Sequence, residues 1–522
     1  MSGRTSMEET TRESPPPEPP APAPPTDRAS DARHFARSGV LQLLSALGQG
    51  LLPVTHILIA RLFGAATFGA YQASVAILDV LSRAGLVGSM HGMHRFIPPA
   101  RAAGDSDLEQ RALGTGIRMT VAVSCVLAVG LAILAPLVAR AWHEPSLAAT
   151  LPIMAPAILL ATTTLALIAA TMAAKVARMS LYVRGISEPL SLLLAVVVAW
   201  WLGPSLRSLT VAHVTSAAIV AALAAAACAR VFGGAYLRRS LRAPRDPAFV
   251  RFALPLGAAD LMSAVLNRTD TFIIASFVGL DALAIYTAAE FITRVIANPR
   301  YLFDSIIAPV LSEALHMKDH ARARYNLALV TRWVITACAP IAVTVIVLRA
   351  EILGLYGAAF ASGSTVLVIL AIHQLVVGCL GLTPYVVAMG GRARLFLVNN
   401  LCAAALNVGL GVALVPRFGI EGAAVSILVS MAAFQVALTI EAWILERVHP
   451  FTTAQLKPVV AALAAFAVES TLHRLMGAGA ARVLAVIAAG LACYIAALAA
   501  LGLAPEERDG LRRLVARVRR RG

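Results

Sequence analysis

The chain has 522 residues, of which 59% are hydrophobic and only 14% are charged. Soluble domains carry about 25% charged and about 45–50% apolar residues, so this composition excludes an ordinary soluble protein. The formal net charge of +16 raises nucleic acid as a partner. However, the basic residues lie between apolar blocks rather than in one domain, which is typical of membrane proteins, and we expect no nucleic acid partner.

The N-terminal segment, residues 1–35, is polar and rich in proline. Such a composition lacks the apolar residues that a packed core needs, so it predicts a disordered cytoplasmic tail. The first apolar stretch begins only after this segment, which argues against a cleavable signal peptide.

The rest of the chain alternates long apolar blocks with short polar connections. A helix needs about 20 apolar residues to cross a hydrocarbon layer of about 30 Å. We therefore predict an all-α membrane protein with about fourteen transmembrane helices, at 38–62, 68–98, 113–140, 149–173, 180–202, 209–233, 252–278, 283–312, 326–349, 364–389, 395–416, 419–446, 455–475 and 480–503.

The distribution of arginine and lysine predicts the orientation. If the N-terminus is cytoplasmic, the inside connections hold twenty-one of these residues and the outside connections hold seven. Cytoplasmic loops of membrane proteins carry such an excess. We therefore expect both termini to be cytoplasmic and the number of spans to be even. The basic tail, residues 504–522, resembles a short helix on the anionic inner leaflet, and a plain disordered tail is the alternative.

The sequence contains an internal repeat. The stretch from Ile59, IARLFGAATFGAY, aligns without gaps on the stretch from Ile274, IASFVGLDALAIY, with a glycine and a tyrosine in register. The offset equals six predicted spans, and an even number of spans preserves direction. The pattern therefore predicts two six-helix lobes, 36–234 and 252–447, related by a pseudo-twofold axis along the membrane normal. Residues 235–251 form a basic cytoplasmic linker between them, and 453–503 add two helices.

Motifs of catalysis are absent from the sequence. A P-loop needs a Gly-Lys-Ser/Thr run, and none of the three lysines follows a glycine. No cysteine or histidine pattern has strong metal-ligand spacing. We expect a transporter rather than an enzyme, with no cofactor and no metal.

The most informative residues are charges inside the predicted spans, because each costs about 2.5–3.5 kcal/mol or more at mid-membrane unless it faces a partner or a cavity. Four i,i+4 pairs place opposite charges on one helix face: Asp79–Arg83, Arg184–Glu188, Glu290–Arg294 and Arg300–Asp304. Two interpretations are open. The pairs neutralise each other between packed helices, or they line a polar cavity between the lobes.

Arg268 has no carboxylate one helical turn away, since Asp270 at i+2 points elsewhere. An unpaired arginine in mid-span needs an external anion, so Arg268 is the strongest ligand candidate. The full set of cavity candidates is Arg83, Arg268, Arg294, Arg300, Asp79, Asp270 and Glu290.

Three segments resemble a known family. ARLFGAATFGAY with GLVGSMHGMHRFIP, LNRTDTFIIASFVGLDALAIYTAAEF, and LNVGLGVALVPRFGIEGAA are similar to the polysaccharide-biosynthesis flippases of the multidrug/oligosaccharidyl-lipid/polysaccharide exporter superfamily. The resemblance covers roughly residues 36–447. It implies alternating access and an undecaprenyl-diphosphate-linked oligosaccharide, carried outward for surface polysaccharide or lipopolysaccharide synthesis. It also implies that cavity arginines attract the diphosphate, for which Arg83, Arg268 and then Arg294 are the matching positions.

Other functions remain open on the sequence. A lipid II flippase and a cation-coupled multidrug exporter share the superfamily, and a membrane glycosyltransferase or polymerase is a third alternative. The central spans are not net acidic, which disfavours export of cations, and the short outside loops disfavour a polymerase. We expect a monomer in the cytoplasmic membrane, with the bilayer and the lipid-linked oligosaccharide as partners and a polysaccharide polymerase as a candidate protein partner.

Overall fold

The computed structural model describes residues 50–176, 178–390 and 392–502, and every regular element in these ranges is helical. The N-terminal half contains α2 (Leu51–Phe63), α3 (Ala65–Leu86), α4 (Ser89–Ala102), α5 (Ser106–Ala141), α6 (Ser146–Met154), α7 (Pro156–Ala173), α8 (Arg178–Ser180), η1 (Leu181–Ser187), α9 (Glu188–Leu202), α10 (Leu206–Phe232) and α11 (Gly234–Arg242).

The second half continues with α12 (Pro247–Asn267), α13 (Thr269–Phe277), α14 (Leu280–His316), α15 (His320–Val347), α16 (Arg349–Gly354), η2 (Ala358–Gly363), α17 (Ser364–Leu380), α18 (Pro384–Met389), α19 (Ala393–Glu446), η3 (Thr453–Gln455), α20 (Leu456–Leu475) and α21 (Ala480–Ala500). The tails expected at 1–35 and 504–522 lie outside the described residues.

The helices fit an integral, multi-pass membrane protein. Within the described residues, eleven helices are long and apolar enough to cross a membrane. The expected span at 283–312 corresponds to α14, which carries several charges. The expected span at 38–62 begins outside the described residues, which contain its second part as α2. The 54-residue α19 reverses at Gly419, whose φ of 59° and ψ of −139° are not helical. The expected number of fourteen spans therefore stays a prediction.

Several expected straight spans are broken in the structure. The span at 68–98 divides into α3 and α4 at Val87 and Gly88, which both have positive φ. The span at 252–278 divides into α12 and α13 at Arg268, whose φ of −112° and ψ of 3° interrupt the helix. Periodicity of apolar residues predicts that a segment is helical, but it does not show where packing against another helix bends that segment.

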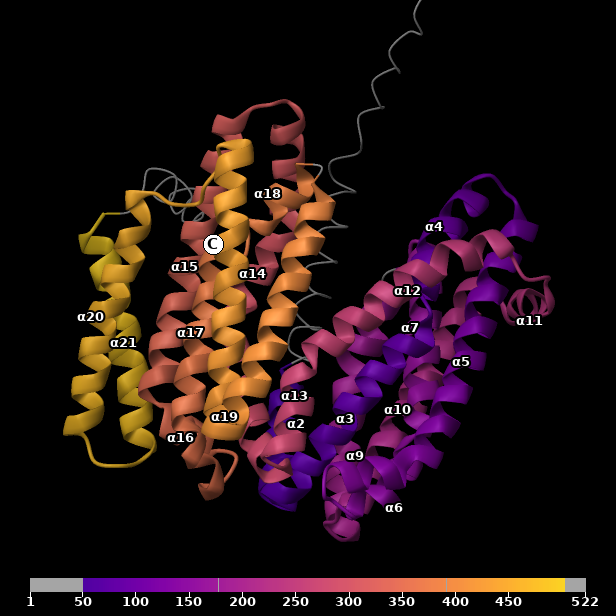
Figure 1. The fold of residues 1–522 in the computed structure, drawn as a ribbon, viewed down its shortest axis with the longest axis horizontal. Helices are drawn as coiled ribbons and strands as arrows, with labels where there is room; N and C mark the ends of the chain where they lie inside the picture. The colour runs from indigo at the N-terminus through magenta and orange to yellow at the C-terminus, as the bar shows by residue number, and fades with distance from the viewer. Residues whose placement is uncertain (1–49, 177, 391, 503–522) are drawn as a thin grey trace, which may run out of the picture.

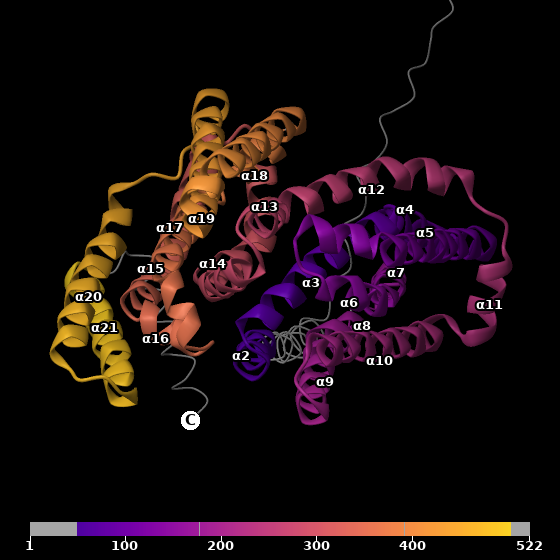
Figure 2. The same ribbon diagram turned by 60° about the horizontal axis from the view of Figure 1, so that its bottom comes forward.

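The helices form two lobes that splay apart at one end of the molecule and meet at the other (Figures 1 and 2). We call α2–α11 the N-terminal lobe and α13–α19 the C-terminal lobe. Helix α12 joins them and packs on α3 and α4, while α13 packs on α19. Phe249 and Ala253 of α12 thus belong to a buried cluster with Leu86, Met93 and Ile97 of the N-terminal lobe. The span expected at 252–278 was assigned to the C-terminal lobe. Its first part, in α12, packs on the N-terminal lobe instead.

The internal repeat predicted from sequence has matching local structure. Gly64 precedes α3 with φ of 86° and ψ of 165°, and Gly279 precedes α14 with φ of 111° and ψ of 175°. Both are left-handed conformations that favour glycine. The paired tyrosines also match, because Tyr71 and Tyr286 are both buried and each hydroxyl contacts a polar side chain of its own lobe.

The two lobes meet where α3 crosses α14. A Cβ added to Gly69 would lie 1.9 Å from the carbonyl oxygen of Leu280 and 3.3 Å from the Cβ of Ala284. Ala284 is the residue that the repeat aligns with Gly69. Equivalent positions touch each other only on a twofold axis, so this crossing marks the predicted pseudo-symmetry axis.

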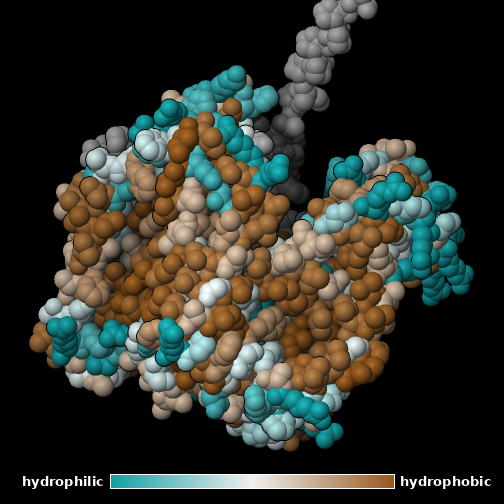
Figure 3. All heavy atoms as spheres, viewed as in Figure 1, coloured by the Kyte–Doolittle hydropathy of each residue, from teal (hydrophilic) through white to brown (hydrophobic). Residues whose placement is uncertain are grey.

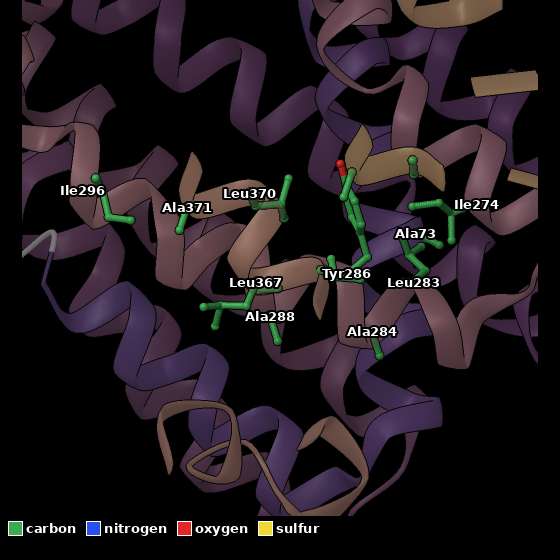
Figure 4. Close-up of a cluster of buried hydrophobic side chains, with 14 of the residues drawn as sticks. Ala73, Ile274, Leu283, Ala284, Tyr286, Ala288, Ile296, Leu367, Leu370 and Ala371 are labelled. Carbon is green, nitrogen blue, oxygen red and sulfur yellow. The ribbon is translucent and has the colours of Figure 1, made fainter. Parts of the chain in front are cut away.

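The core of this contact region is apolar and continuous across the lobes. One cluster joins Ala73 of α3 to residues of α13, α14 and α17, including Ile274, Leu283, Ala288 and Leu367, and Figure 4 draws these side chains. On the surface, a hydrophobic belt crosses the molecule between two more polar ends, and the lobes are separated by a notch at the upper end (Figure 3). The belt is the surface expected to face lipid.

The last two membrane helices, α20 and α21, pack against α15 through polar contacts in the apolar region. Thr344 donates a hydrogen bond to Glu469 over 3.0 Å, and Tyr494 donates one to the carbonyl of Thr336 over 2.9 Å. A buried carboxylate costs several kcal/mol without a partner, so Glu469 fixes this helix pair in one position on the C-terminal lobe.

Candidate functional site: two polar cavities at the junction of the lobes

Two cavities open between the helices of the described residues, one in each lobe. The N-terminal cavity, of about 250 Å³, is lined by α3, α7, η1, α9 and α10 and includes Asp79, Arg83, Arg184, Glu188, His213 and Arg268. The C-terminal cavity, of about 630 Å³, is lined by α12, α13, α14, α17 and α19 and by Asp79 of α3. Its polar lining includes Asp79, Arg268, Asp270, Glu290, Arg294, Arg300, His373, Gln374, Asn400 and Asn407.

Asp79 and Arg268 line both cavities. The Nε of Arg268 lies 3.0 Å from Oδ2 of Asp79, and the two side chains are 23% and 39% exposed. Asp79 belongs to α3 of the N-terminal lobe, whereas Arg268 lies at the break between α12 and α13. This ion pair therefore joins the two lobes and forms part of the wall between their cavities.

The pairing corrects two sequence predictions. Arg268 was expected to have no carboxylate partner, and Asp79 was expected to pair with Arg83 on its own helix. The i,i+4 spacing reports only neighbours on one helix, while the break at Arg268 brings its guanidinium across to α3. Arg83 consequently has no hydrogen-bond or ion-pair partner among the described residues, and it is exposed along the N-terminal cavity.

A second arginine lines the N-terminal cavity. The Nε of Arg184 lies 3.4 Å from Oε2 of Glu188, as the i,i+4 spacing predicts. Nearby, the Tyr71 hydroxyl lies 2.9 Å from Nδ1 of His213, which leaves the other ring nitrogen of His213 for the cavity. With Arg268 included, three arginines face two carboxylates here, so the N-terminal cavity is net basic.

The C-terminal cavity is richer in hydrogen-bonding groups. Asp270 accepts a hydrogen bond from the Tyr286 hydroxyl over 3.1 Å and one from the Asn407 amide over 3.0 Å. Asn407 in turn accepts one from Ser426 over 2.7 Å. This network joins α13, α14 and both halves of α19, so it fixes the shape of the cavity wall.

Charges on α14 line the same cavity. Glu290 and Arg294 form the expected i,i+4 ion pair at 2.5 Å, and the Arg294 guanidinium also lies 5.3 Å from the centre of the Phe291 ring. Arg300, six residues after Arg294 on α14, also lines this cavity. The pair expected between Arg300 and Asp304 involves a side chain outside the described part. Three arginines and three carboxylates line this cavity, so it is close to neutral.

All seven candidates from sequence line one of the two cavities, and contact with a substrate stays a prediction. Sequence reasoning did not single out His213, whose partner Tyr71 lies 142 positions away. It placed Arg184 only in an i,i+4 pair, and His373 and Gln374 were not among its candidates, although all three line the cavities. Their polarity inside apolar helices was the available signal. Within the described ranges, no group of three His, Cys, Asp or Glu side chains is arranged to hold a metal ion.

Comparison with known proteins gives the following similarities. Residues 36–315 match the family described as "Polysaccharide biosynthesis protein". No curated protein sequence matches the chain. A solved structure of the lipid II flippase MurJ in an inward closed conformation superposes with a TM-score of 0.69 at 13% identity, covering 88% of this chain and 97% of that one.

Two further solved structures show the same fold. An inward-facing multidrug resistance MATE family transporter of the MOP superfamily has a TM-score of 0.67 at 12% identity, with 76% of this chain and 94% of that one covered. A MOP superfamily transporter from Pyrococcus furiosus, whose binding pocket has reversed polarity, has a TM-score of 0.55 at 12% identity, with coverages of 78% and 94%.

Proposed function

Because the chain belongs to the polysaccharide biosynthesis protein family, we propose that it is a flippase that carries a lipid-linked oligosaccharide with a diphosphate linker across the cytoplasmic membrane. The observation that carries the proposal is Arg268, which lines both cavities at the junction of the lobes. The transported lipid would be undecaprenyl-diphosphate-linked, for synthesis of a surface polysaccharide such as lipopolysaccharide.

Arginine suits the diphosphate for a chemical reason. Its planar guanidinium binds pairs of phosphate oxygens and does not lose its proton. Arg268 and the unpaired Arg83 line the net basic N-terminal cavity together, and Arg184 adds a third positive charge there. We assign the diphosphate to this cavity, next to the ion pair.

The sugar chain fits the C-terminal cavity. Its lining includes the amide groups of Gln374, Asn400 and Asn407 and the imidazole of His373. These groups donate and accept hydrogen bonds as sugar hydroxyls do. The volume of about 630 Å³ lies within the range of about 300–1,000 Å³ that is typical of ligand pockets, so it holds a few sugar rings rather than a long polymer.

Transport follows from the arrangement of the lobes. They meet at the α3–α14 crossing and separate at the end that carries α4, α11 and α12 (Figure 1), which we assign to the cytoplasmic side from its arginine content. Alternating access then closes this end and opens the other. With the cell interior negative, outward movement of an anion gains about 2.3 kcal/mol per charge per 100 mV, so flipping needs no ATPase.

A lipid II flippase is the second candidate, and the similarity to such a flippase over 88% of this chain favours it. It uses the same diphosphate site and differs only in the sugar. A cation-coupled multidrug exporter is disfavoured because neither cavity is net acidic. We further propose that both termini are cytoplasmic, that the protein is a monomer, and that a polysaccharide polymerase is its protein partner.

The variant Arg268→Ala tests the proposal in cells. It removes the guanidinium and leaves the Asp79 carboxylate without its ion-pair partner, but Asp79 is 39% exposed and lines both cavities. The protein should therefore still insert and accumulate, while surface glycan per transporter should fall by about tenfold or more. Arg268→Lys should restore only part of this activity, because lysine keeps the charge and loses the bidentate geometry. Normal glycan per transporter in the alanine variant would remove Arg268 from the substrate site.

A further inference from the structure

Helix α11 lies at the outer edge of the N-terminal lobe, on the side away from the C-terminal lobe (Figures 1 and 2). It connects α10 to α12 and has the sequence GAYLRRSLR. In the space-filling view, the hydrophobic belt of this lobe ends at a polar rim on the same edge (Figure 3). The helix therefore lies at the height where a membrane-spanning protein passes from hydrocarbon to lipid headgroups.

One face of α11 is held firmly on α5. Tyr236 donates a hydrogen bond to Glu109 over 2.9 Å, and Arg118 donates one to the carbonyl of Leu241 over 3.0 Å. A Cβ added to Gly114 of α5 would lie 1.7 Å from the carbonyl oxygen of Ser240. This close backbone contact fixes the position of α11, so its opposite face keeps a constant orientation.

The opposite face is strongly basic. Arg238, Arg239 and Arg242 of this face are exposed, as is Arg245 in the connection to α12, and none has an ion-pair or hydrogen-bond partner among the described residues. The sequence contains no Asp or Glu between Glu188 and Asp246. On α5, which packs against α11, Glu109 pairs with Arg101 and Asp107 pairs with Arg111, so these carboxylates have arginine partners other than the exposed ones of α11. Leu241 between these arginines is 38% exposed, which adds an apolar contact to the same surface.

We propose that this basic surface, defined by Arg238, Arg239, Arg242 and Arg245, binds the headgroups of acidic phospholipids in the adjoining leaflet. Charge complementarity selects this occupant, because guanidinium groups bind phosphate oxygens in pairs and an anionic leaflet attracts basic residues at its surface. The hydrophobic belt beside α11 places the headgroups within reach, and the long arginine side chains extend toward them.

Lipid binding at α11 acts on one lobe only. The backbone amide of Asp246 donates a hydrogen bond to Thr115 of α5 over 2.9 Å, and the Asp246 side chain caps α12. The headgroups would therefore hold α5, α11 and the start of α12 as one unit against the leaflet. The C-terminal lobe stays free to move relative to this unit.

The test compares lipid retention by purified full-length protein extracted from vesicles of equal parts phosphatidylglycerol and phosphatidylcholine. Native mass spectrometry counts the lipids of each class that remain bound. The triple variant Arg238→Gln, Arg239→Gln, Arg242→Gln should lose its preference for phosphatidylglycerol. An attraction of about 1 kcal/mol per arginine corresponds to about a fivefold change in preference for each residue. The matched control is Arg140→Gln, Arg207→Gln, Arg417→Gln, which removes three exposed arginines from the opposite end and should leave the preference unchanged.

A second measurement does not depend on the variants. Raising the salt from about 0.1 M to about 1 M shortens the Debye length from about 10 Å to about 3 Å, and the wild-type protein should then release phosphatidylglycerol preferentially. Equal phosphatidylglycerol retention by the wild type and the α11 variant overturns the proposal. The proposal is also overturned if the α11 variant and the control variant lose phosphatidylglycerol equally. Phosphatidylglycerol retention that does not change with salt overturns it too. None of these outcomes depends on whether the protein transports a lipid-linked sugar.

Discussion

The ion pair between Asp79 and Arg268 allows a direct test of how the substrate is bound. In the structure, Oδ2 of Asp79 lies 3.0 Å from Nε of Arg268, so the carboxylate already pairs with this guanidinium. A diphosphate that binds Arg268 must compete with this carboxylate. The variant Asp79→Asn removes the competing charge and keeps a side chain of similar size, so it should tighten diphosphate binding.

The structure sets the size of the effect. Two unit charges about 4 Å apart interact by about 4 kcal/mol at an effective dielectric constant of 20. Asp79 is 39% exposed, and solvent screening reduces partly exposed pairs to about 0.2–1 kcal/mol. Taking the upper end of this range, Asp79→Asn should increase the affinity for a diphosphate by about fivefold.

The assay is equilibrium binding of undecaprenyl diphosphate to purified protein, with inorganic pyrophosphate as a probe without a lipid tail. A double-mutant cycle separates the pair from other effects, because Asp79→Asn should give no gain when Arg268 is already alanine. The surface pair Asp107–Arg111 lies outside both cavities, so Asp107→Asn is the matched control and should leave affinity unchanged.

Two results would refute this reasoning. If Asp79→Asn binds diphosphate no better than the wild type, the carboxylate does not compete with the substrate. If the gain persists in the Arg268→Ala background, the effect of Asp79 acts through another group, and Arg83 on the same helix is then the first residue to examine.

Three other predictions follow from the fold and the sequence. Gly69→Val should force α3 and α14 apart and lower the thermal unfolding temperature, since overpacking costs about 1–3 kcal/mol, whereas Gly130→Val, with nothing within 4 Å of the added carbon, should not. A reporter active only outside the membrane, fused after Gly522, should be silent, and a strong signal would reverse the proposed orientation. Deletion of residues 2–30 should leave glycan export near normal at equal protein level, and loss of export would show that this tail has a role.

The sequence predicted the helical segments closely because length and hydropathy are local properties. The span expected at 480–503 corresponds to α21 at Ala480–Ala500, and the two glycines that the internal repeat aligns both have positive φ before a helix. The sites of helix breaks were not predictable in this way. The interruption at Arg268 depends on α12 packing against one lobe and α13 against the other, which no pattern within the segment reports.

Packing between distant helices also explains why some ion-pair partners in the cavities were predicted wrongly. Spacing along one helix correctly gave the Glu290–Arg294 and Arg184–Glu188 pairs. It failed for Asp79, whose partner Arg268 is 189 positions away. Charges inside apolar helices identified seven of the residues that line the cavities, because such charges need a partner or water. Which partner each charge has is decided by the packing of distant helices.

As a flippase, this protein would move a lipid-linked diphosphate sugar across a bilayer. The most direct measurement reconstitutes it in liposomes with a fluorescent undecaprenyl-diphosphate-linked oligosaccharide and follows loss of inner-leaflet label to a quencher outside, without ATP. We predict transbilayer movement that requires Arg268 and is faster when the interior is made negative. A rate equal to that of protein-free liposomes, or equal rates for wild type and Arg268→Ala, would contradict the account.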